Sequence, residues 1–350
     1  MTNELFITLL SVAFGLLLGW GFKTLPQEGW QILATIPANK KEDGGWKGIN
    51  LTYYGLFTSI AYVVAVATFI LLCSTLKMPM LQVTLIVVIV LAVCVPASRL
   101  VAIIVERKQH TFTVAGAFFV GVIIMPLVVW ASNQMFWGQS QGTVPVIPTL
   151  AAAAIAYTFG EGLGRLACIS YGCCYGKCVH ESHPLLQRIF QRWNFRFFGA
   201  TRKIAYAGGM EGEAVIPVQG ITAVLYLCSG LYAVLVYLNG SFFTALMLTL
   251  VVTQGWRLVS ETMRADYRGG GKISAYQIMA VIAPFYVLGF GLLLDESFTG
   301  RVDLNAGIAA IWNPGMLLLL QSIGLILFLY TGRSTITGSE ISFHVHTELT

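Results

Sequence analysis

Residues 51–75 read LTYYGLFTSIAYVVAVATFILLCST, a run of 25 residues without a charged side chain. About 20 apolar residues are enough for an α-helix to cross the hydrocarbon core of a bilayer. The rest of the chain has the same character, since 56% of its 350 residues are hydrophobic, 11% are charged, and the mean hydropathy is +0.74. Soluble domains are about 25% charged. The composition therefore excludes an ordinary soluble enzyme and predicts a multi-pass membrane protein.

The same length criterion predicts about nine membrane-spanning helices, so the expected fold is an all-α polytopic membrane protein. The predicted spans cover residues 5–23, 51–75, 81–105, 112–133, 147–171, 217–238, 241–263, 274–294 and 312–331.

Two longer hydrophilic stretches, 24–50 and 177–216, interrupt the spans. Within the second, residues 185–198 place apolar side chains at helical spacing with arginines between them, which predicts an amphipathic helix at the lipid interface. The net charge of +5 indicates topology and contact with anionic lipid, and we do not expect a nucleic-acid partner.

Arg165 lies at the end of an apolar run, in the segment 164–177 that reads GRLACISYGCCYGK. An ionisable residue in a span is costly, so it marks a functional site or an arginine that reaches toward the headgroups. Gly172 and Gly176 permit backbone conformations closed to other residues, such as a turn that wraps a ligand.

A second group of charges follows at Arg257, Glu261 and Arg264, spaced so that all three lie on one face of a helix. Arg257 and Glu261 are expected to pair. A salt-bridged helix end is one interpretation. The other is a phosphate clamp, because guanidinium groups bind phosphate with two parallel hydrogen bonds, and Arg165 and Arg257 could meet around one headgroup.

Seven cysteines are present, and four of them fall between residues 168 and 178. Their spacing is not the paired pattern of zinc sites, and adjacent Cys173 and Cys174 are not expected to face one ion. We therefore predict small packing residues, with no bound metal and no cofactor, although a redox role stays open. Cys73, Cys94 and Cys228 lie within apolar runs and are predicted to pack there.

At these residues the chain resembles the prolipoprotein diacylglyceryl transferase family, whose members move the diacylglyceryl group of phosphatidylglycerol onto a lipoprotein cysteine and release glycerol phosphate. Gly164-Arg165, Gly172 and Tyr175-Gly176-Lys177 match the family signature in order and spacing. Cys168 stands where the family has Asn and Cys173 where it has Glu, as in a Cys-Cys-Tyr-Gly variant associated with divergent members.

Further landmarks follow in the family's order. Residues 53–56 (YYGL) resemble its Trp-Tyr-Gly-Leu, residues 98–100 (SRL) its Gly-Arg-hydrophobic motif, and residues 217–219 (PVQ) its Pro-Ser-Gln, without the following Tyr-Glu. Residues 257–264 match its Arg-x3-Glu-x2-Arg element, and Lys272 to Gln277 resemble the start of its next span. The family's His-Gly-Gly motif is absent, because residues 113–118 read TVAGAF. That histidine is a candidate for assisting transfer to a thiol, and His110, His180 or His183 could replace it.

The resemblance implies three parts: an extra span and hydrophilic loop in 1–50, a transferase-like core in 51–294 with the inserted segment 177–216, and an extra span and polar tail in 295–350. It implies a lipid-binding transferase with a phosphatidylglycerol-like substrate and an acceptor such as a lipoprotein precursor. The implied site consists of catalytic Arg165, Arg257 and Glu261, and substrate-binding Tyr54, Arg99, Gly172, Gly176, Lys177, Gln219 and Arg264.

Two other classes stay open: a non-catalytic phospholipid-binding or lipid-translocating protein, and a thiol-redox membrane protein. The location implied by the resemblance is the bacterial cytoplasmic (inner) membrane, with the reaction at its outer face. The distribution of charge points the other way, because the loops 24–50, 106–111, 177–216 and 264–273 share one face and carry most of the loop lysines and arginines.

Overall fold

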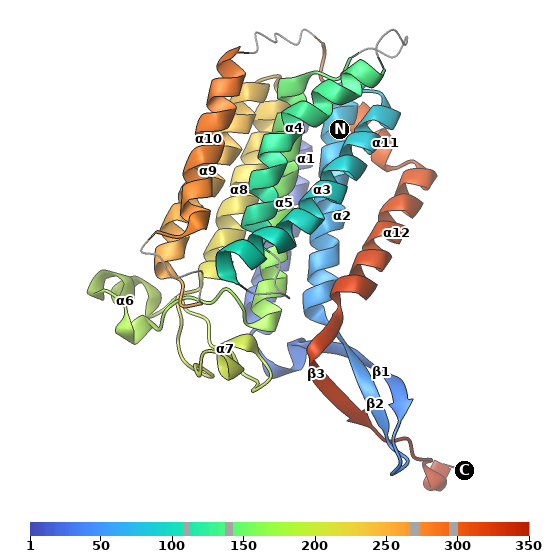
Figure 1. The fold of residues 1–350 in the computed structure, drawn as a ribbon, viewed down its shortest axis with the longest axis vertical. Coiled ribbons are helices and arrows are strands. Elements are labelled where there is room, and N and C mark those ends of the chain that lie inside the picture. The colour runs from blue at the N-terminus through green and yellow to red at the C-terminus, as the bar shows by residue number, and fades with distance from the viewer. Residues whose placement is uncertain (108–112, 137–142, 267–272, 294–299, 350) are drawn as a thin grey trace.

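The computed structural model describes residues 1–107, 113–136, 143–266, 273–293 and 300–349 (Figure 1). Lys272 and His110 lie outside the described residues. Within the described ranges, nine helices are long and apolar enough to cross a membrane, and this confirms the all-α polytopic fold. Their ends fall within two residues of the predicted spans. They are α1 (Asn3–Thr24), α2 (Tyr53–Thr75), α3 (Met80–Glu106), α4 (Val114–Met135), α5 (Val146–Tyr171), α8 (Val218–Leu238), α9 (Phe242–Met263), α10 (Ala275–Leu293) and α12 (Pro314–Thr331).

Shorter elements connect these helices. They are α6 (Pro184–Phe190), α7 (Lys203–Tyr206), α11 (Leu304–Ile311) and the 3-10 turns η1 (Glu28–Trp30), η2 (Val179–Glu181) and η3 (Thr347–Leu349).

Helix α5 is the centre of the bundle. It packs against α1, α2, α4, α8 and α9, and it is the most deeply buried of the nine spans in the described ranges. Small residues allow this close packing: a Cβ atom on Gly160 would lie 3.0 Å from the Cβ of Ala65 on α2, and one on Gly162 would lie 3.1 Å from the Leu227 side chain on α8. A polar side chain on α5 is therefore held inside protein, away from lipid.

A three-stranded antiparallel sheet joins the two ends of the chain, with β2 (Trp46–Thr52) between β1 (Ile32–Lys40) and β3 (Arg333–Ile341). The sequence analysis assigned these segments to a hydrophilic loop and a polar tail and did not foresee the strands. The terminal spans also join the core, since α1 packs against α8 and α12 against α2. The sheet, α6 and α7 lie at one end of the bundle, opposite the N-terminus (Figure 1).

The predicted amphipathic helix over 185–198 is wrong in its length, because α6 ends at Phe190. Asn194 accounts for this end of the helix. Its side-chain amide donates to the carbonyls of Phe190 and Gln191, both at 3.0 Å. These carbonyls therefore have hydrogen-bond donors without a further turn of helix. Leu185 and Trp193 are exposed, as expected for a segment at a lipid interface.

We expect Gly55→Ala to destabilise the protein, because the new Cβ would lie 2.1 Å from the Cα of Gly332, where α12 ends beside α2. Such overpacking typically costs about 1–3 kcal/mol. The measurement is the thermal unfolding midpoint in detergent. Gly15→Ala in α1 is the matched control, since a Cβ there meets no atom within 4 Å; equal midpoints for the two variants would contradict the close contact.

Candidate functional site

A carboxylate lies between two arginines inside the bundle. Tyr157, Glu161 and Arg165 follow one another at intervals of four residues on α5, so they share one face of that helix. Glu161 accepts a hydrogen bond from Arg165 with one oxygen and, at 2.8 Å, one from Arg257 of α9 with the other. Arg257 also donates to the Tyr157 hydroxyl at 2.6 Å, and that hydroxyl donates to Glu161. Glu161 is 6% exposed and Arg257 is 7% exposed.

Arg165 and Arg257 thus come together from two helices, as the clamp hypothesis requires, but the expected partner of Arg257 is wrong. Glu261 is half-buried on α9, while Arg257 turns toward α5 and pairs with Glu161. Glu161 and Tyr157 were not among the site residues predicted from the sequence. The available signal was an acidic residue within a predicted span, four positions before an arginine, which is the spacing of a helical ion pair.

The charges of this cluster do not cancel. Two guanidinium groups share one carboxylate, and the Nε of Arg165 is buried without a hydrogen-bond partner. Arg264 is separately neutralised, because its Nε and Nη2 donate to the two oxygens of Asp266 at 2.7 and 2.8 Å. A buried site with one positive charge in excess favours an anion.

The glycine-rich segment forms the turn that the sequence predicted. Gly172 ends α5 in the left-handed conformation with φ 68°, and the N–H of Cys173 donates to the Cys168 carbonyl at 3.0 Å. Gly176 passes so close to the segment before α8 that a Cβ would lie 2.4 Å from the Ile216 carbonyl oxygen. The turn is therefore in close contact with the segment before α8.

Backbone hydrogen bonds fasten this turn to the end of α9. Gly176 forms a bridge with Arg264, the N–H of Lys177 donates to the Met263 carbonyl at 2.9 Å, and the N–H of Ala265 donates to the Tyr175 carbonyl at 3.1 Å. The two sequence motifs, about 90 positions apart, become one structural unit.

Gln219 and Tyr54 complete the surroundings. Gln219, at the start of α8, is fully buried and donates to the Cys173 carbonyl at 2.8 Å, while its Oε1 has no hydrogen-bond partner. Tyr54, at the start of α2, packs its ring edge-on against the ring of Tyr171, the last residue of α5. Both were predicted to bind substrate, and both border the turn.

Other predicted residues lie apart from this buried group. Arg99 is exposed on α3, a helix that packs against α4, and Lys177 is exposed beyond the turn. His180 and His183, considered as replacements for the family histidine, are exposed. His180 faces Glu213 at 3.9 Å and does not approach the arginines.

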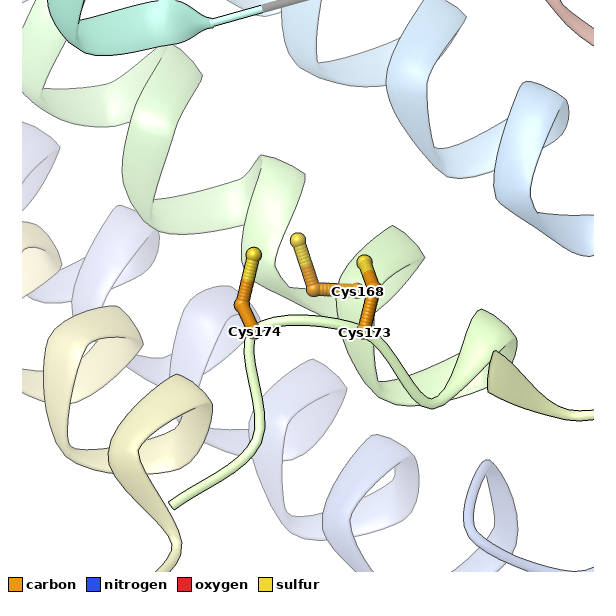
Figure 2. Close-up of side chains that lie close together, drawn as sticks. All are labelled: Cys168, Cys173 and Cys174. Atoms are coloured by element: carbon orange, nitrogen blue, oxygen red, sulfur yellow. The ribbon is translucent and has the colours of Figure 1, made fainter. Parts of the chain in front are cut away.

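The premise that Cys173 and Cys174 cannot face one ion is also wrong. Figure 2 shows Cys168, Cys173 and Cys174 pointing to the same side of the turn after α5, and their sulfur atoms all lie within 4.8 Å of one another. The physical reason is the backbone of Cys174, whose φ of 57° turns its side chain back toward Cys173. Cys178 points elsewhere and contacts the Met210 sulfur at 3.3 Å.

The trio (Cys168, Cys173 and Cys174) lies next to the arginines. Arg165 precedes Cys168 by three residues on α5, and Arg264 forms a backbone bridge with Gly176, two residues after Cys174. Hydrogen bonds from Cys168 and Cys174, together with burial, raise the pKa of the Cys173 thiol well above its usual value. The arginine cluster and the trio therefore form one continuous polar site at the end of α5. Comparisons with protein-family models, curated proteins and solved structures find no match for this chain.

Proposed function

We propose that this protein is an integral membrane transferase. It binds a glycerophospholipid, phosphatidylglycerol or a close analogue, transfers its diacylglyceryl group to an acceptor, and releases glycerol phosphate. The observation that carries the proposal is the buried excess of positive charge, in which Arg165 and Arg257 share the single carboxylate of Glu161. A phosphodiester carries one negative charge, so its phosphate complements this excess.

The same geometry suits the chemistry of the transfer. When the bond between the glyceryl carbon and the phosphate oxygen breaks, the leaving phosphate gains negative charge. Fixed guanidinium groups in a site shielded from water stabilise such charge strongly. Glu161 binds both arginines, and the Nε of Arg165 and the Oε1 of Gln219 are buried without a hydrogen-bond partner, so each would gain one from a headgroup that entered the site.

The resemblance to the diacylglyceryl transferases supports the same reaction, with a lipoprotein precursor as the acceptor and the bacterial cytoplasmic membrane as the location. A second candidate is a phospholipid-binding or lipid-translocating protein that uses the same arginines without breaking a bond. Two observations favour it: the family histidine is missing from residues 113–118, and Glu161 already occupies both arginines.

The deciding experiment incubates the purified protein in nanodiscs with phosphatidylglycerol and a cysteine-bearing lipoprotein signal peptide, followed by mass spectrometry. Glycerol phosphate together with a peptide heavier by one diacylglyceryl group is the expected result. Intact phosphatidylglycerol that copurifies with the protein, with no released product, supports the second candidate. Neither product nor bound lipid contradicts both.

We expect the site to open toward the outer face of the membrane, and cysteine labelling tests this. Ala207 is exposed in the segment beside the site, whereas Gly209 is unsuitable because its φ of 63° would strain a cysteine. In intact cells, Ala207→Cys should react with a membrane-impermeant maleimide, and Ser241→Cys, between α8 and α9 at the opposite end, should react only after lysis. The reverse pattern would place the basic face in the cytoplasm, as the charge distribution indicates.

A further inference from the structure

We propose that Cys168, Cys173 and Cys174 form a binding site for one zinc ion, with one coordination position left open. Their side chains converge from two elements, one from the last turns of α5 and two from the turn that follows (Figure 2). Nothing in the arginine cluster requires these thiols to meet. The inference reverses the sequence-based expectation of simple packing residues.

The distances suit a thiolate-bound metal. Zinc–sulfur bonds of about 2.3 Å place the sulfur atoms of a tetrahedral site about 3.8 Å apart. The three sulfur atoms lie within 4.8 Å of one another, which is at most about 1 Å beyond that spacing.

The backbone is shaped to present the three thiols together. Cys174 adopts a left-handed conformation that costs a non-glycine residue about 1 kcal/mol or more. The neighbouring bridge between Gly176 and Arg264, with the hydrogen bond from Gln219 to the Cys173 carbonyl, holds the turn in place. Isolated packing residues would not need to be held together in this way.

A bound Zn²⁺ deprotonates the thiols that coordinate it, so the site does not need thiolates in the metal-free protein. Arg165 precedes Cys168 by three residues on α5, which places the two side chains on the same side of that helix.

Among the described residues the set stops at three ligands. Cys178 contacts Met210, and His180 and His183 are exposed outside the turn. Structural zinc sites in proteins normally use four protein ligands, whereas catalytic sites use three and leave the fourth position to water or substrate. Three thiolates therefore indicate an open site.

The role of the open position rests on the proposed transferase function. It would take the acceptor as a thiolate, and the thiol proton would pass to water on binding. Cys168, Cys173 and Cys174 would hold the ion, which would supply a thiolate nucleophile at neutral pH. In the proposed transfer the acceptor sulfur would bond to the glyceryl carbon next to the phosphate as that carbon–oxygen bond breaks, and the electron pair would leave with the phosphate oxygen of glycerol phosphate. Thiolate activation by zinc would supply what the family histidine is expected to supply.

The first test measures metal binding without any activity. The protein is purified with a thiol-free reductant, loaded with Zn²⁺ or Co²⁺, desalted, and examined by elemental analysis and absorption spectroscopy. We expect one metal per chain and intense thiolate-to-cobalt charge-transfer bands. Cys173→Ser/Cys174→Ser should lose both, and Cys228→Ser, a matched control on α8, should keep both. Absence of stoichiometric metal in the reduced wild-type protein, or metal retained by the double variant, would overturn the site.

The second test separates the open position from the proposed function. A short peptide with one cysteine is added to the Co²⁺-loaded protein without phospholipid, and the same peptide with serine is the control. A shift of the cobalt bands with the cysteine peptide alone is expected. Unchanged bands would overturn the thiol-binding role. If the bands shift but no glycerol phosphate is ever released from phosphatidylglycerol, the zinc site stands and the transferase proposal fails.

Discussion

Arg257→Lys and Arg165→Lys are each expected to lower the rate of glycerol phosphate release by at least about 100-fold. Each guanidinium binds Glu161. In the proposed transfer each would stabilise the charge that develops on the leaving phosphate, and removal of one such group typically costs about 3–4 kcal/mol in the transition state. Lysine keeps the charge but lacks the planar fork, so it cannot hold Glu161 and a phosphate oxygen together. Arg192→Lys, an exposed change in the same polar segment as α6, is the matched control.

Glu161→Gln separates positioning from charge. The amide keeps the shape of the side chain but leaves two uncompensated guanidinium groups, so the substrate phosphate becomes their main counterion. We therefore expect tighter binding of phosphatidylglycerol together with a slower release of glycerol phosphate. Binding and turnover are measured separately, by lipid titration and by single-turnover kinetics. An unchanged rate in all three variants would remove the arginine cluster from the mechanism.

The membrane fold was predictable because lipid imposes a simple length rule on apolar segments. The predicted ends of α2, α5 and α9 fall within two residues of the observed ones. The sheet was not predictable by that rule. It pairs β2 with β3, nearly 300 positions away in the sequence, and neither strand has an apolar run that marks it.

The site was predictable in part for a related reason. Arg165 and Arg257 are recognisable as charges in apolar spans. Gly172 and Gly176 predicted a turn. The partner of Arg257 depends on how α9 faces α5, which a helical spacing within α9 cannot reveal. Helical spacing favoured Glu261, whereas packing selects Glu161. The convergence of the three cysteines depends on the φ angle of Cys174, which no sequence pattern predicts.

Arg202→Met is expected to destabilise the protein more than any other single change outside the arginine cluster. Arg202 is fully buried, and its guanidinium donates to backbone carbonyls at the ends of two helices. The distances are 3.1 Å to Ile169 on α5 and 2.9 Å to Leu25 after α1, and it also binds Ser170, Gln27 and Phe198. These carbonyls lie where helices end and lack partners within the helix. Burial lowers the pKa of Arg202 to about 10, so the side chain stays charged at neutral pH.

Methionine fills much of the same space but leaves those carbonyls buried without donors. Each buried carbonyl left without a donor typically costs about 1–3 kcal/mol, and we expect the thermal unfolding midpoint in detergent to fall by about 5–10 °C. Arg192→Met, exposed in the preceding segment, should leave the midpoint nearly unchanged. Because Ile169 and Ser170 precede the turn directly, Arg202→Met should also weaken Co²⁺ binding by the trio while every cysteine is still present. A variant that lost neither stability nor metal affinity would show that the carbonyls find other donors, and that Arg202 does not set the position of the turn.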